Sequence, residues 1–188
     1  MKKLVLILLL LMVSGDLVSQ NRKQRKAEKK ARVEAQFKKT KALIDSGKFQ
    51  FVAQSATPLG NDVARVGRSF NGGSAIFQGN RVNLTSIDNA LIITNENAEI
   101  FLPFFGRVFF PNKINNQSGI AYNGKIDNYE VKIDKKNRIL VKFTIDPKDD
   151  FIKYTLLINP SGSTLCTMNS TNRQTISYNG TVMAKNDL

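Results

Sequence analysis

The 188-residue sequence contains no histidine and a single cysteine, Cys166. The missing histidines and cysteines exclude Ser-His-Asp triads, histidine acid–base catalysis and the common zinc sites. One cysteine cannot form an internal disulfide, so we expect Cys166 to be a small buried apolar residue. The sequence therefore predicts no metal site and no cofactor, and leaves only carboxylate or lysine chemistry to an enzyme of this composition.

Long apolar runs are almost absent, and the one that stands out is Leu4 to Val13, behind two lysines. Ten residues are too few to span a bilayer, which takes about 20. A cationic start, a short apolar core and small residues beyond it are typical of an export signal. We expect a signal peptide over residues 1–19, with Ser19 favoured over Gly15 as the cut, and a periplasmic or secreted protein. An uncleaved N-terminal anchor is the alternative.

Negative charge is scarce in the segment that follows. Residues 22–41 hold ten Lys and Arg against two Glu, a net charge of +8, whereas residues 42–188 hold 16 basic against 12 acidic residues, a net charge of +4. The abundance of Ala, Lys, Arg, Glu and Gln favours a helix. The sequence predicts one basic helix over residues 20–46, ending at Ser46-Gly47.

The two halves of this predicted helix differ in apolar content. Val33, Phe37 and Ile44 share one face by helical spacing, so the second half is predicted to dock on the rest of the chain. Residues 21–32 offer almost nothing for packing and are predicted to be solvated, as charge runs usually are. They form either a spacer, which we favour, or an electrostatic tether that makes peripheral contact with anionic lipid, lipopolysaccharide phosphates or an acidic polymer. Nucleic acid is not expected, because an exported chain rarely meets it.

From Lys48 the apolar spacing changes to period two, which is typical of β-strands. Ala56 to Gly60 is predicted to end the first strand, and residues 60–80 to form a long connection or a loose hairpin. Later strands are predicted at Arg81 to Thr85, Ala90 to Thr94, Ala98 to Leu102, Ser118 to Ile126, Tyr129 to Asp134, Arg138 to Ile145, Phe151 to Ile158, Ser163 to Met168 and Gln174 to Met183.

Short turns between these strands indicate an antiparallel meander. We therefore predict a mainly β fold over residues 47–188, in which the meander closes into a lipocalin-like β-barrel or a flattened sandwich, preceded by one basic helix.

The densest apolar segment, Phe101 to Pro111, holds five of the twelve phenylalanines. Pro103 and Gly106 exclude one regular central strand there. The segment is predicted to be either a core corner or the mouth of a pocket for an apolar ligand with a cationic rim. The candidate ligand-binding residues are Phe104, Phe105, Arg107, Phe109 and Phe110.

Two further charged positions offer weaker candidate sites. Asp149-Asp150 could be paired acids or calcium ligands, but no loop of calcium-binding spacing surrounds them, so a charged hairpin turn is favoured. Arg173 could bind an anion, but a lone arginine before a strand is expected to be solvated.

Several segments of the chain resemble the family called domain of unknown function 4251, and so does the order of signal, basic helix and β region. The resemblance implies a small exported protein of Gram-negative bacteria with a lipocalin-like topology, and it implies no activity. The segments are Ala56 to Pro58, Val82 to Thr85, Leu102 to Arg107, Ile126 to Val131 and Asn172 to Gly180.

These observations predict an exported, non-catalytic barrel that binds an apolar or envelope-derived ligand, or a protein partner. Two alternatives stay open. One is a carboxylate-dependent enzyme acting on glycans, which would need two acids about 5 to 10 Å apart across a cleft. The other is a structural envelope protein tethered by its basic helix.

Overall fold

The computed structural model describes residues 2–60, 77–110, 119–147 and 150–185, with side chains described from Arg22 onward. One helix, α1 (Lys2–Asp45), precedes all the described strands. The chain divides into two compact units, Met1–Gln36 and Phe37–Leu188. Among the residues whose side chains are described, no helical stretch is both long and apolar enough to cross a bilayer. The predicted export signal falls within residues 1–21, whose side chains the structure does not describe.

The second unit is built from a single sheet whose described strands are all antiparallel to their neighbours. The strands are β1 (Lys48–Pro58), β2 (Phe77–Gln78), β3 (Arg81–Asn83), β4 (Ala90–Thr94), β5 (Asn97–Pro103), β6 (Gly119–Lys125), β7 (Asp127–Ile133), β8 (Ile139–Ile145), β9 (Ile152–Ile158), β10 (Ser163–Ser170) and β11 (Ile176–Ala184).

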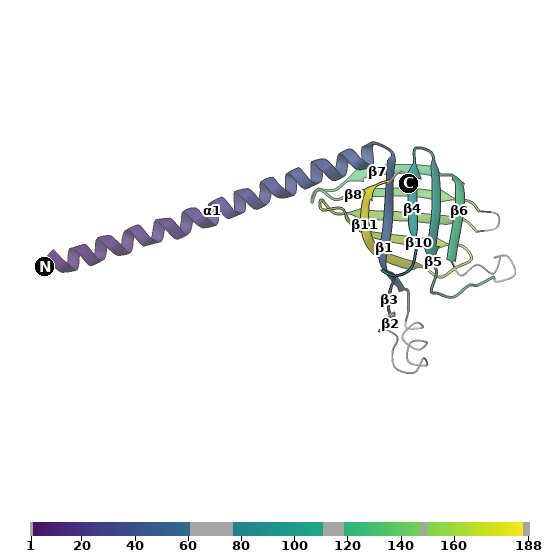
Figure 1. Ribbon diagram of the computed structural model, residues 1–188, viewed down its shortest axis with the longest axis horizontal. Helices are drawn as coiled ribbons and strands as arrows, with labels where there is room; N and C mark the ends of the chain where they lie inside the picture. The colour runs from purple at the N-terminus through teal and green to yellow at the C-terminus, as the bar shows by residue number, and fades with distance from the viewer. Residues whose placement is uncertain (1, 61–76, 111–118, 148–149, 186–188) are drawn as a thin grey trace. The chain divides into compact units, whose positions relative to one another are not determined.

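The strand order is β6-β5-β4-β1-β11-β10-β9-β8-β7, with β3 pairing with β1 and β2. In Figure 1, β1, β4, β5 and β6 form one layer, and β7, β8 and β10 cross behind it. The outermost strands of the order, β6 and β7, follow each other in the chain with only Ile126 between them. The sheet is therefore nearly closed into a barrel, which confirms the predicted mainly β fold with a preceding helix.

The interior of the barrel is filled by side chains that alternate along the strands. In β8, for example, Ile139, Val141 and Phe143 are buried, whereas Leu140 and Lys142 between them are partly exposed. The Phe143 and Tyr154 rings stack with their centroids 5.2 Å apart. Because large rings bury the most apolar area, such layers dominate the stability of the core.

One prediction about the first strand is wrong, and the prediction for the connection after it is only partly tested. β1 continues through Ala56 to Pro58 and pairs there with β11, so the predicted break at Ala56 is wrong. A proline lacks a backbone donor but is tolerated at the end of a strand. The rest of the predicted connection is only partly described: β2 and β3 form a short hairpin, and residues 61–76 lie outside the described residues.

β1 carries a bulge at Gln54, where it faces the Asn179-Gly180 pair of β11. A side chain at Gly180 would place its Cβ 2.0 Å from the carbonyl oxygen of Val52. The glycine is therefore required by the close approach of two backbones, as glycines inside strands often are.

The end of α1 belongs to the same compact unit as the sheet, from Phe37 onward. Ile44 is fully buried, and Phe37 and Leu43 pack against the core. The hydroxyl of Thr40 donates to the carbonyl of Pro160 in the β9–β10 turn, at 2.8 Å. The predicted docking is thus confirmed from Phe37 onward, whereas the predicted contact of Val33 is wrong, because that side chain is exposed.

Candidate functional site

The part of the Phe-rich segment that follows β5, residues 104–110, is held against the segment that leads into β11. Val108 forms an isolated bridge with Arg173. On either side of it, the amide of Phe109 donates to the carbonyl of Asn172 at 2.8 Å, and the amide of Gln174 donates to the carbonyl of Arg107 at 2.9 Å. These backbone bonds fix the segment at one end of the barrel.

A buried ion pair lies beneath this segment. Arg173 is 8% exposed and Asp150 is 6% exposed, and Nε of the arginine lies 3.3 Å from Oδ2 of the aspartate. Arg173 also donates through Nη1 to the carbonyl of Gly119 and lies over the Phe104 ring, with Cζ 5.3 Å from the centroid. The prediction of a solvated Arg173 is therefore wrong. Asp150 does lie in the connection between β8 and β9, as the predicted charged hairpin turn requires, but its side chain is buried. Asp149 lies outside the described residues.

The carboxylate of Asp150 also organises the chain between β10 and β11. It accepts hydrogen bonds from the Ser170 and Thr171 hydroxyls and from the amide of Asn172. A buried charge is tolerated only when it is paired and its lone pairs are used. This cluster meets both conditions, so it is explained as a structural anchor without any ligand.

Two tyrosines inside the barrel differ in their bonding. The hydroxyl of Tyr178 donates to the carbonyl of Pro103 at 2.8 Å. The hydroxyl of Tyr154 is buried without a hydrogen-bond partner among the described residues. Burial raises the pKa of both hydroxyls and of the Cys166 thiol, so all three groups stay neutral at physiological pH. Cys166 is buried and free, as expected from the sequence.

The five candidate residues of the Phe-rich segment lie in two different environments. Phe104 and Phe105 are half-buried and pack against the core. Arg107, Phe109 and Phe110 are exposed, the two rings by more than half of their surface. The structure therefore brings Phe104 and Phe105 to the core and leaves the other three at the surface.

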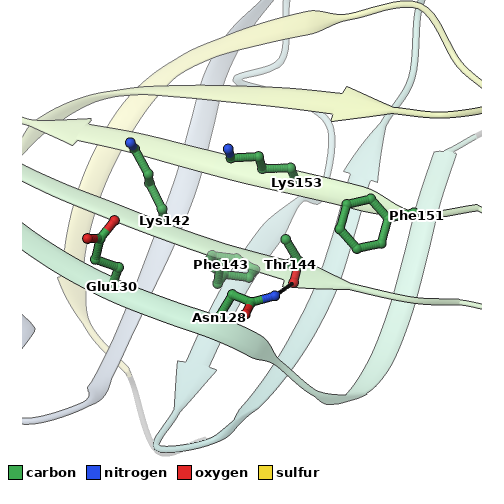
Figure 2. Close-up of a pocket in the computed structure, with 7 residues that line it drawn as sticks. All are labelled: Asn128, Glu130, Lys142, Phe143, Thr144, Phe151 and Lys153. Carbon is green, nitrogen blue, oxygen red and sulfur yellow. Dashed lines mark hydrogen bonds between the residues drawn. The ribbon is translucent and has the colours of Figure 1, made fainter.

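A pocket of about 350 Å³ opens on the outer face of β7, β8 and β9. Figure 2 shows the Lys142 and Lys153 side chains rising from neighbouring strands on the same side, with Glu130 beside Lys142. The phenyl ring of Phe151, half exposed, forms an apolar wall. The lining residues are Asn128, Glu130, Lys142, Phe143, Thr144, Phe151 and Lys153. We call this the outer pocket.

The shape of the outer pocket follows from a bulge in β7. One extra residue lies between Asp127 and Glu130, and Asn128 adopts a left-handed backbone with φ 53°. Asparagine tolerates this conformation better than most residues. Its amide donates to the Thr144 hydroxyl at 3.0 Å, and that hydroxyl donates to the carbonyl of Asp127. Bulges redirect side chains and are frequent next to binding sites.

The outer pocket has an excess of positive charge. Its single carboxylate, Glu130, is paired with Lys132 on the same strand. The hydrogen bond from Lys132 lowers the pKa of Glu130, and the charges of Lys132, Lys142 and Lys153 lower it further. Among the described residues, neither Lys142 nor Lys153 has a carboxylate within 4.0 Å. Two ammonium groups are thus available to a ligand.

Sequence reasoning missed the outer pocket because each of its lysines is an ordinary outward-facing residue of a predicted strand. The available signal was the position of Lys142 and Lys153 at outward positions of two consecutive strands. Only the register, which pairs Lys142 with Thr155 and Thr144 with Lys153, brings them together.

Comparison with known proteins supports the fold and supplies no activity. A family model described as "Domain of unknown function (DUF4251)" matches residues 31–182. The crystal structure of a DUF4251 family protein from Bacteroides eggerthii DSM 20697 is similar, with a TM-score of 0.54 and 17% identity, over 80% of this chain and 88% of that one. At this identity the likeness concerns the fold alone. No curated protein matches the chain.

Proposed function

Because the chain belongs to the DUF4251 family, whose description names no activity, we propose from the site itself that it is an exported, non-catalytic protein that binds an anionic component of the cell envelope in the outer pocket. The observation that carries the proposal is the pair of lysines, Lys142 and Lys153, beside the exposed ring of Phe151. The Leu4 to Val13 run supports export, since its flanks and length are typical of a signal peptide.

The chemistry of the outer pocket favours an acidic sugar. Lysine ammonium groups form charge-assisted hydrogen bonds with carboxylate and phosphate oxygens. The Asn128 amide can bond hydroxyl groups, and the apolar face of Phe151 can pack against a sugar ring. A few polar groups beside an aromatic wall are the usual composition of a small-molecule site.

The proposal is tested by titrating the chain with glucuronate and with glucose 6-phosphate, using neutral glucose as the uncharged reference. We expect both anions to bind more tightly than glucose and to lose affinity as salt is added. The double variant Lys142→Gln/Lys153→Gln should weaken binding of the anions by about tenfold or more, because it removes two charge-assisted hydrogen bonds.

The matched control is Lys135→Gln/Lys136→Gln, which removes the same charge from the exposed β7–β8 turn and should leave affinity unchanged. Equal losses in the two double variants, or equal binding of glucose and the anions, would rule out the outer pocket as an anion site. Mass spectrometry of a glycan carrying uronic acids, before and after incubation, separates binding from catalysis. A cleaved glycan would favour the alternative of a carboxylate-dependent enzyme.

A second candidate is an apolar ligand or protein partner at the Phe-rich segment. The observation that favours it is the exposure of Phe109 and Phe110 on a segment fixed by backbone bonds. The variant Phe109→Ser/Phe110→Ser should reduce binding of a hydrophobic dye such as ANS, while Phe101→Ser, at an exposed ring on β5, should do so less. Equal reductions would remove this candidate.

A third candidate is electrostatic tethering by the exposed helix residues 22–35. Sedimentation with anionic phospholipid vesicles should then fall with added salt and disappear when residues 21–32 are deleted. Unchanged sedimentation after that deletion would leave the segment as a spacer.

A further inference from the structure

The two strands at the open seam of the barrel, β6 and β7, each have a neighbour on one side only among the described strands. β6 contains two glycines, and the Tyr122 hydroxyl of that strand is bonded to the carbonyl of Lys125. β7 contains neither glycine nor proline, pairs regularly from Glu130 to Ile133 after its bulge, and among the described strands has β8 as its one neighbour. Its backbone therefore presents an unpaired edge, which is a template for another strand.

The inner face of β7 is apolar and remains open to solvent. Val131 and Ile133 face the same way as their buried partners Val141 and Ile139 in β8. Yet Val131 is 39% exposed and Ile133 is 46% exposed, whereas both partners are buried. Tyr129, two residues before Val131, is exposed to the same degree. Three apolar side chains along the unpaired edge of β7 are thus only partly buried, and a partner strand would bury them further.

The sequence of β7 is complementary to itself when it is reversed about Val131. In an antiparallel pair centred there, Glu130 lies opposite Lys132 of the second copy, and Lys132 lies opposite its Glu130. Tyr129 lies opposite Ile133 in the same reciprocal way. Opposite charges and aromatic–β-branched pairs are the cross-strand combinations that stabilise a sheet. A pairing centred on Glu130 instead, which shifts the register by two residues, would place the Glu130 carboxylates of the two copies opposite each other.

We propose that two copies of this chain pair edge to edge through β7, antiparallel and with a two-fold axis at Val131. Such an interface is isologous, so each complementary pair occurs twice. It continues the sheet from one copy into the next and gives partners to the free backbone groups of β7. Glu130, now paired with Lys132 of its own strand, exchanges that partner for Lys132 of the second copy. The proposal does not rest on ligand binding in the outer pocket.

Sedimentation velocity of the full-length chain over a range of concentrations tests the pairing. The wild-type chain should show a dimer fraction that rises with concentration. Glu130→Lys and Lys132→Glu each place like charges opposite each other twice, so each should raise the dimer dissociation constant by about tenfold or more. The double swap Glu130→Lys/Lys132→Glu restores both opposite pairs and should restore the dimer.

Glu99→Lys on β5 makes the same charge change away from this edge and should leave the dimer intact. Thermal unfolding of each variant checks that the barrel is folded, since all these side chains are exposed or half-exposed. A wild-type chain that is monomeric throughout would overturn the proposal. So would single swaps that behave like Glu99→Lys, or a double swap that fails to restore the dimer.

Discussion

The two ends of the barrel are closed by different kinds of contact. At the end formed by the β9–β10 turn, apolar side chains of α1 pack on the core and Thr40 bonds Pro160; we call this the helix end. At the opposite end of β9 and β10, Asp150 and Arg173 form a buried ion pair beneath Phe104; we call this the ion-pair end. Apolar packing tolerates small rearrangements, whereas a buried charge depends on one partner in one geometry.

The largest expected effect comes from breaking the ion-pair end. Asp150→Asn should lower the free energy of unfolding by about 3 to 5 kcal/mol, because it leaves the Arg173 guanidinium buried without a counter-charge. Urea denaturation measures the loss. The double variant Asp150→Asn/Arg173→Met should be more stable than the single one, since it removes the stranded charge. The single variant Arg173→Met completes the comparison. If the double variant loses as much stability as the two single variants together, the two charges are not coupled and the contrast between the two ends fails.

A smaller loss is expected at the helix end. Ile44→Ala should lower the free energy of unfolding by about 2 to 4 kcal/mol, since it removes a fully buried side chain and leaves a cavity. Val33→Ala, at an exposed position of the same helix, should change it by less than about 0.5 kcal/mol. Similar losses in the two variants would mean that α1 does not close the barrel through Ile44.

The smallest effect distinguishes the two buried tyrosines. Tyr178→Phe should lower the free energy of unfolding by about 1 kcal/mol, because it leaves the Pro103 carbonyl at the ion-pair end without its hydrogen-bond donor. Tyr154→Phe removes a buried hydroxyl that has no partner among the described residues. The variant should therefore be as stable as the wild type or more stable. Thermal unfolding compares the two variants, and a larger loss for Tyr154→Phe would reveal a partner for that hydroxyl.

Most of the strands were predictable because one face of each is buried, and the alternation along β4 or β8 records this directly. The long-range contacts were not. Asp150 and Arg173 are separated by 23 positions, and each looks like a surface charge until the turn after β10 folds back on the start of β9. Lys142 and Lys153 meet only through the register of β8 and β9.

The Phe-rich segment marks another limit of sequence reasoning. Its composition indicates burial, but composition does not distinguish Phe104, which lies under Arg173, from Phe109, which is exposed. That difference depends on the bridge between Val108 and Arg173, which joins segments 65 positions apart.

The pairing of β1 with β11 has a consequence for synthesis and transport. The first strand of the sheet finds its longest partner in the last one, across more than 110 residues of intervening chain. Contacts between such distant segments form late and slowly. Until the final strand has left the ribosome, β1 lacks its main neighbour and the barrel cannot close. If the chain is exported, as proposed, this delay keeps the barrel unfolded while the chain is being synthesised, and an unfolded chain can pass through a secretion channel.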